Sequence, residues 1–132
     1  MAYAERTKVP VMQSRNEIER VLTKYGADAF GFATEPEHAI VFFRAHGRYL
    51  KFKMPLPRDN AHEERRRWRC LVLVIKAKLE AVESGIVSFE NEFLPWIVLP
   101  SGETVAEWAG PQIEQGYLEG RMPTALLEGP KK

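Results

Sequence analysis

The sequence predicts a single domain of the α+β class, and three observations lead to this prediction. A stretch with helical periodicity comes first, three β-rich runs joined by short turns follow it, and a longer helical stretch comes next. The chain has 132 residues, of which 45% are hydrophobic and 11% aromatic, so it can bury one core. We therefore predict one domain over residues 1–132, with an α-β-β-β-α core at 14–85.

The first helix is predicted to begin at Ser14. Residues 1–13 carry little periodicity and include Pro10, so we expect an extended arm there. Ser14 and Glu17 have the spacing of a capping box, in which both side chains bind free backbone N–H groups at a helix start. Gly26 supplies a left-handed position that ends the helix. The apolar stripe between these signals has i, i+3, i+4, i+7 spacing and consists of Ile18, Val21, Leu22 and Tyr25.

Three β-rich runs at 28–34, 38–45 and 48–54 predict an antiparallel meander. His46-Gly47 is suited to a two-residue turn between the last two runs, which would place Ala45 opposite Arg48. The register that follows pairs Arg44 with Tyr49, Phe43 with Leu50, Phe42 with Lys51 and Val41 with Phe52.

The two faces of this meander differ in composition. The predicted core face carries Val41, Phe43, Leu50, Phe52 and Met54. The opposite face mixes aromatic and basic groups, namely Ile40, Phe42, Arg44, Tyr49, Lys51 and Lys53. The C-terminal segment is one candidate to cover this second face, with the lysine stems lying over the apolar groups.

A long helix is predicted over 61–84, with Asp59 or Asn60 as its cap and Gly85 at its end. Its large apolar stripe consists of Trp68, Leu71, Val72, Ile75, Leu79 and Val82, and we expect it to pack on the sheet. A second stripe of smaller residues, on the opposite side, consists of Cys70, Val74, Ala77 and Ala81. This stripe is expected to meet either the C-terminal segment or a second copy of the protein.

The segment 86–119 is predicted to form a C-terminal helical subregion packed around the long helix. Its run 96–99 is strand-like, and Thr104 and Glu107 form a second capping box that opens a last helix, with Pro111 near its start. Residues 120–132 are rich in Pro and Gly and are expected to be a flexible tail.

The composition bounds the setting of the protein. Nineteen basic and 18 acidic residues give a net charge of +1, so any attraction to nucleic acid or to a membrane must be local. The sequence shows neither a secretory signal nor a run of about 18 apolar residues, and we expect no membrane association. The single Cys70 lies in an apolar run, where we interpret it as a buried hydrophobe in a reducing compartment. We therefore predict a soluble cytoplasmic protein.

The sequence contains no motif for catalysis, for metal binding or for a cofactor. His38, His46 and His62 lack metal-ligand spacing to one another or to Cys70. We therefore predict a non-enzymatic protein without metal or cofactor. An enzyme is the third-ranked alternative, because catalytic residues can assemble from distant segments without a local signature.

The basic run at the start of the long helix is the main charge feature. The first hypothesis is that it contacts nucleic acid, because arginine donors match phosphate and the sheet adds lysines and a stacking ring. The residues of this hypothesis are Arg65, Arg66, Arg67, Arg69, Lys51, Lys53, Tyr49 and Arg44. The alternative is that Glu63 and Glu64 neutralise the run by i, i+3 and i, i+4 pairing.

The second hypothesis is a protein-interaction module or inhibitor that acts on another protein, with a homodimer as one form. Its interface would use two tryptophans and the small-residue stripe of the long helix. The residues are Trp96, Trp108, Val74, Ala77 and Ala81.

The predicted order of elements resembles the double-stranded-RNA-binding domain over residues 14–84. Glu35-Pro36-Glu37-His38 lies where that family has Gly-Pro-x-His, and the basic run 65–67 lies where it has lysines. Glu35 departs from the family's glycine, and Glu35 and Glu37 would repel phosphate. The resemblance implies contact with RNA through the second helix.

A second resemblance is to a group of small uncharacterised proteins of tailed phages and prophages. It rests on the segments 63–69, 71–85 and 89–108, and on the shorter stretches 8–10 and 45–48. It implies a phage or prophage setting inside a bacterial cytoplasm, where the partner in the second hypothesis would be a host or phage protein, and it supplies no catalytic residues.

Overall fold

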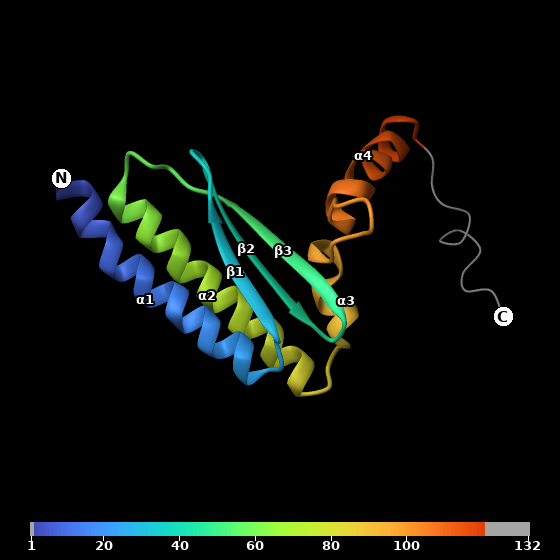
Figure 1. The fold of residues 1–132 in the computed structure, drawn as a ribbon. Helices are drawn as coiled ribbons and strands as arrows, with labels where there is room; N and C mark the ends of the chain where they lie inside the picture. Colours follow the sequence, from blue (N-terminus) through green and yellow to red (C-terminus); the bar gives the residue numbers. More distant parts are fainter. Residues whose placement is uncertain (1, 121–132) are drawn as a thin grey trace.

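The structure is a computed structural model, and it describes residues 2–120. The chain forms a three-stranded antiparallel sheet in the order β1-β2-β3, which confirms the predicted α+β class (Figure 1). The elements in chain order are α1 (Ala2–Lys24), β1 (Ala29–Thr34), β2 (His38–Ala45), β3 (Arg48–Pro55), α2 (Ala61–Glu83), α3 (Phe89–Phe93), the 3₁₀ helix η1 (Leu94–Trp96) and α4 (Val105–Leu118).

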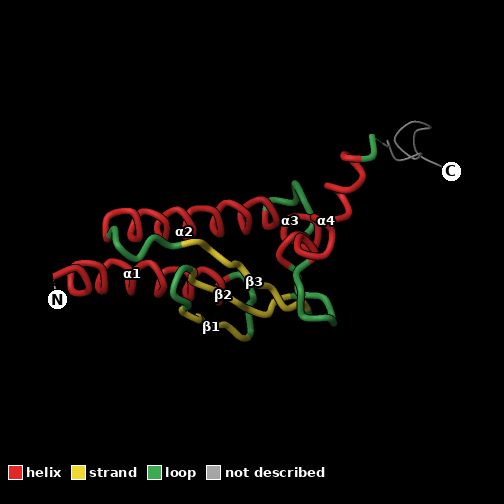
Figure 2. The backbone as a smooth tube through the Cα atoms, turned by 90° about the horizontal axis from the view of Figure 1, so that it is seen from above, coloured by secondary structure: helices red, strands yellow, loops and turns green. Residues whose placement is uncertain are grey.

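Helices α1 and α2 lie side by side, run in the same direction and cover one face of the sheet (Figures 1 and 2). The large apolar stripe of α2 is buried against this face, as predicted, and Ile75 is fully inaccessible to solvent. On the sheet, Val41 and Leu50 are equally buried. The core therefore lies between the helix pair and the sheet, where burial of each large side chain contributes roughly 1.5 to 3 kcal/mol.

Helix α1 differs from the prediction for the N-terminal segment. The expected extended arm over 1–13 is wrong from residue 2 onward, because α1 begins at Ala2 and continues through Pro10. Ser14 is therefore a buried residue inside the helix, and the predicted capping box does not exist. Val11 packs against the core one turn before Ser14, so the apolar stripe of the helix extends past the predicted start. Tertiary packing thus outweighs the helix-breaking tendency of Pro10.

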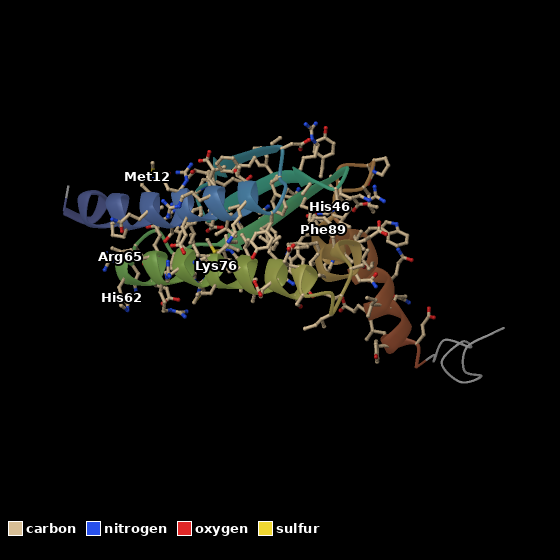
Figure 3. The ribbon with its side chains drawn as sticks, turned by 90° about the horizontal axis from the view of Figure 1, so that it is seen from below. Met12, His46, His62, Arg65, Lys76 and Phe89 are labelled. Carbon is tan, nitrogen blue, oxygen red and sulfur yellow. The ribbon has the colours of Figure 1, made fainter. Side chains whose placement is uncertain are left out.

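The register of the sheet is the one that the His46-Gly47 turn predicts, with Ala45 opposite Arg48 and Val41 opposite Phe52. Both turn residues have positive φ, 53° at His46 and 72° at Gly47, as a type I′ turn requires. The His46 ring also stacks on Phe89, with ring centroids 4.3 Å apart (Figure 3).

Helix α3 closes one end of the core. The Phe93 side chain is fully buried and meets the rings of Phe43 and Phe52 edge-on, at centroid distances of 6.1 and 6.4 Å. The Lys78 ammonium on α2 pairs with Glu92 at 3.0 Å. Within the C-terminal subregion, α3 is therefore an element that packs on α2.

The segment between α3 and α4 contains little strand. The strand-like run 96–99 forms only isolated bridges, between Leu50 and Ile97 and between Val98 and Thr104, because Pro95 and Pro100 bound it closely. The second capping box is confirmed, since Thr104 and Glu107 each bind the other's backbone N–H at the start of α4. Residues 121–132 of the expected flexible tail lie outside the described residues.

Candidate interaction surfaces

Two of the arginines in the basic run are held by Glu63, which lies in the first turn of α2. Arg66 Nη2 lies 2.6 Å from a Glu63 carboxylate oxygen, and Arg67 Nε lies 3.2 Å from the same oxygen. These hydrogen bonds, that from Arg66 first, lower the pKa of Glu63 to about 2. Arg67 also donates to the Pro55 carbonyl at 2.8 Å. The alternative predicted from the sequence, in which a glutamate of the same helix neutralises the basic run, is therefore observed for Arg66 and Arg67.

A third arginine of the run is held by helix α1. Arg69 Nη1 lies 2.7 Å from Glu17, and Lys76 binds the other oxygen of the same carboxylate. The hydrogen bonds from Lys76 and Arg69 lower the pKa of Glu17. Arg65 is half-buried. Sequence reasoning missed the Glu17 cluster, because its partners come from helices whose pairing the sequence does not show.

The outer face of the sheet carries the remaining predicted cations. Each of them lies near a carboxylate: Arg44 Nε is 2.8 Å from Asp28, Lys51 is 4.0 Å from Glu107 and Lys53 is 3.6 Å from Glu35. The Arg44 guanidinium lowers the pKa of Asp28 through its hydrogen bond. Arg44 also donates to the Tyr49 hydroxyl at 3.3 Å, so Tyr49 is tied to this group.

The structure does not bring the predicted nucleic-acid residues into one patch. Lys51 and Lys53 alternate with the buried Leu50 and Phe52, so they point away from the helices. The arginines of α2 lie on the helix layer, on the other side of the sheet (Figure 2). The candidate surface is therefore two separate groups of ion pairs.

A shallow depression lies between the β1–β2 turn and the start of α2, and Arg58 lines it together with Arg67. The Arg58 guanidinium is fully engaged in the fold. It binds the buried Glu64 carboxylate at 2.7 Å, and it donates to the backbone carbonyls of Glu35 and His38 at 3.0 and 3.2 Å. Arg58 therefore joins three segments of the fold, and the depression offers no unpaired guanidinium to a ligand.

Helix α4 extends beyond the sheet, and none of its residues is buried (Figures 1 and 2). Its side chains at i, i+4, i+8 and i+12 are Val105, Ala109, Ile113 and Tyr117, which we call the α4 ridge. Val105 and Ala109 are half-buried at the η1 end, whereas Ile113 is 59% exposed and Tyr117 84% exposed. The described part of the chain therefore leaves the C-terminal half of this apolar ridge, Ile113 and Tyr117, uncovered.

Trp108 and Trp96 have different environments. Trp108 is 52% exposed on the first turns of α4. Trp96 is half-buried, stacks on Phe52 at a centroid distance of 4.9 Å and carries the Lys78 ammonium 4.1 Å above its ring. Of the two predicted interface tryptophans, only Trp108 is free to meet a partner through most of its surface.

The second stripe of α2 is an exposed apolar surface. Cys70 is exposed, which contradicts the expectation that it is a buried hydrophobe, because the core stripe of α2 lies on the opposite side of the helix. Leu73 and Val74 are 53% and 44% exposed, and Ala77 is exposed as well. Ala81 is half-buried. We call these five residues the α2 outer stripe, and sequence reasoning missed Leu73 as a member.

The charge of the chain is distributed unevenly between the body and the C-terminal arm. Residues 86–120 contain six glutamates and no lysine, arginine, histidine or aspartate. The α2 helix, in contrast, carries four arginines and two lysines against four glutamates. The arm that ends in α4 is therefore acidic and apolar, whereas α2 has a small excess of cations, several of which are held in ion pairs.

No family model, curated protein or solved structure matches this chain.

Within residues 2–120, no three potential metal ligands of the His, Cys, Asp and Glu types come together, and His46 and His62 lie at different ends of the molecule (Figure 3). No helix of the described part is long and apolar enough to span a membrane.

Proposed function

We propose that this protein is a non-enzymatic protein-interaction module whose binding element is α4. The observation that carries the proposal is that this capped helix has no buried residue and exposes Ile113 and Tyr117 side by side on the α4 ridge. Proteins commonly use such a helix by inserting its apolar side into a groove of a partner. Burial of each large side chain would contribute roughly 1.5 to 3 kcal/mol, and clustered exposed apolar groups usually mark an interaction site.

The partner class we propose is a host or phage protein. The support for this setting is the resemblance to tailed-phage and prophage proteins, which implies an interaction inside a bacterial cytoplasm. A groove with basic groups at its rim would suit α4, because all the charged residues of the arm 86–120 are glutamates.

Nucleic-acid binding is the second candidate. The arginines of the basic run are its support, since Arg66 and Arg69 keep 56% and 53% of their side chains exposed despite their ion pairs. A phosphate would have to compete with Glu63 and Glu17 for these donors, and binding would weaken as the salt concentration rises. This competition is the reason that we rank it below protein binding.

Site-specific photo-crosslinking in living bacteria tests the proposal. A photoreactive amino acid at position 113 reports contacts of the α4 ridge, and the same group at position 19 is the matched control on an exposed position of α1. We expect protein adducts from position 113 that are absent from position 19. The adducts should disappear when Tyr117→Asp is added, because the new carboxylate would be buried in the contact.

The competing candidate is measured in parallel by fluorescence anisotropy with labelled single-stranded and double-stranded DNA and RNA. Salt-sensitive binding that is lost in the Arg66→Glu/Arg69→Glu variant, together with no adduct at position 113, would replace our proposal by nucleic-acid binding.

A further inference from the structure

We infer that the surface bound by α4 is the α2 outer stripe of a second copy of this chain, so that two copies form a reciprocal dimer. The inference rests on the proposed function and names the partner of the same element. Three properties of the described residues support it: the shapes of the two helix surfaces, their charges, and the position of α4 within its own chain.

The shapes of the two surfaces suit helix-on-helix packing. On α2, Cys70 and Val74 form one i, i+4 row, and Leu73, Ala77 and Ala81 form the row beside it. Neighbouring rows of side chains on a helix leave a groove between them, and three of the five side chains beside this one are small. Arg66 Nη1 lies against its start, 3.7 Å from Cys70 Sγ. The α4 ridge is itself an i, i+4 row whose free members are large, and the packing of such rows into such grooves is the commonest helix contact in globular proteins.

The charges of the two surfaces are complementary. Glu114 follows Ile113 directly, and the whole arm 86–120 has no cation. Beside the α2 outer stripe lie Arg69, Lys76 and Glu80 on one side and Arg67 on the other. Glu17 and Glu63 pair with these cations, but α2 as a whole keeps six cations against four glutamates. The acidic α4 is therefore attracted to the α2 of a second copy, whereas two α4 helices packed on each other would bring glutamates together.

Within one chain α4 cannot reach this stripe. Its start is fixed beside β3, by a 2.9 Å hydrogen bond from Val105 N to the Ile97 carbonyl and by the Lys51–Glu107 pair on the outer face of the sheet. The α2 outer stripe faces away from the sheet on the opposite layer. The stripe is therefore available to the α4 of a second copy. When each chain places its α4 on the stripe of the other, the assembly closes at two chains.

Sedimentation analysis of the purified full chain tests the dimer. We expect a species of twice the 15.1 kDa monomer mass. Ile113→Asp on the ridge and Val74→Asp on the stripe should each weaken dimerisation at least about 100-fold, because each would bury unpaired carboxylates. Both side chains are exposed in one chain, so the circular dichroism should stay as in the wild type, and the thermal midpoint should match that of wild-type chain diluted until it is monomeric.

A mixture of the two variants separates this dimer from other assemblies. The intact α4 of the Val74→Asp chain can bind the intact stripe of the Ile113→Asp chain, so the mixture should form a heterodimer although neither variant dimerises alone. A wild-type dimer that both variants retain would overturn the inference, because its interface would lie elsewhere.

The single cysteine provides a direct test of contact. Ile113→Cys should form a disulfide with Cys70 of the second copy on mild oxidation and give a covalent dimer on a non-reducing gel. The control Ile113→Cys/Cys70→Ser should give none of this product. Self-binding would be overturned if the wild-type chain stays monomeric at micromolar concentrations and the Ile113→Cys chain forms no crosslink that depends on Cys70. Adducts from position 113 to a different protein would then still support the proposed function.

Discussion

The ion pair between Arg58 and Glu64 is predicted to hold the start of α2 to the sheet, and Glu64→Gln tests this role. Only 7% of the Glu64 side chain is exposed, and its oxygen lies 2.7 Å from Arg58 Nη1. The substitution keeps the shape of the side chain but removes the charge that faces the guanidinium.

The expected cost follows from the burial of the two partners. Removal of one partner from a fully buried pair costs about 3 to 5 kcal/mol. The Arg58 side chain is 34% exposed, so water compensates part of this loss, and we expect a decrease of about 1.5 to 3 kcal/mol in the free energy of unfolding. For a chain of this size that decrease corresponds to a fall in the thermal midpoint of roughly 5 to 12 °C.

Urea unfolding followed by circular dichroism and by tryptophan fluorescence measures this change, with Trp68 as a buried reporter close to the pair in sequence. Glu19→Gln, on the exposed side of α1, is the matched control and should change stability by less than about 0.5 kcal/mol. If Glu64→Gln were as stable as this control, Arg58 would not depend on the carboxylate, and our account of this junction would be wrong.

Three further predictions concern the core and the response to acid. Phe93→Ala should cost about 3 to 5 kcal/mol in urea unfolding, since its ring is fully buried, and a cost below about 1 kcal/mol would contradict the placement of α3. Ile75→Asp should leave the chain unfolded by circular dichroism, and an unchanged thermal midpoint would refute the core assignment. The pKa values of Glu17, Asp28 and Glu63 are lowered in the folded state, so their contribution to stability is complete above their ordinary values near 4 and is lost as the pH falls toward 2. Thermal midpoints that do not decrease between pH 5 and pH 2.5 would show that these ion pairs do not stabilise the fold.

Local signals in the sequence predicted the sheet and the long helix. The His46-Gly47 turn was enough to assign the register, because a two-residue loop permits only one pairing of the flanking residues. The core stripe of α2 followed from periodicity, which depends only on neighbours within the helix. Thr104 and Glu107 likewise form their capping box within a few residues of each other.

Features that depend on long-range packing were not predicted. The helix continues past Pro10 into Val11, which contacts a core assembled from distant segments. The Glu17 cluster joins α1 to residues more than fifty positions away, and no spacing in the sequence relates them. The exposure of Cys70 depends on which of two apolar sides of α2 meets the sheet, and periodicity alone gives both sides similar weight.

The candidate surfaces were predicted only in part. Trp108 and Val74 were named in advance and are exposed, whereas the basic run and the sheet lysines were grouped although they lie on different layers. Ile113 was missed, although its i+4 spacing from Ala109 and to Tyr117 is visible in the sequence. An apolar ridge on a C-terminal helix resembles an ordinary core stripe until the rest of the fold shows that nothing in residues 2–120 covers it.

The central claim is that α4 binds protein, and the yield of photo-crosslinked protein from position 113 relative to position 19 tests it most directly. Our account predicts discrete adducts from position 113, either of dimer size or with another protein, and none from position 19. Equal yields at the two positions, or no adduct at either, would contradict the claim.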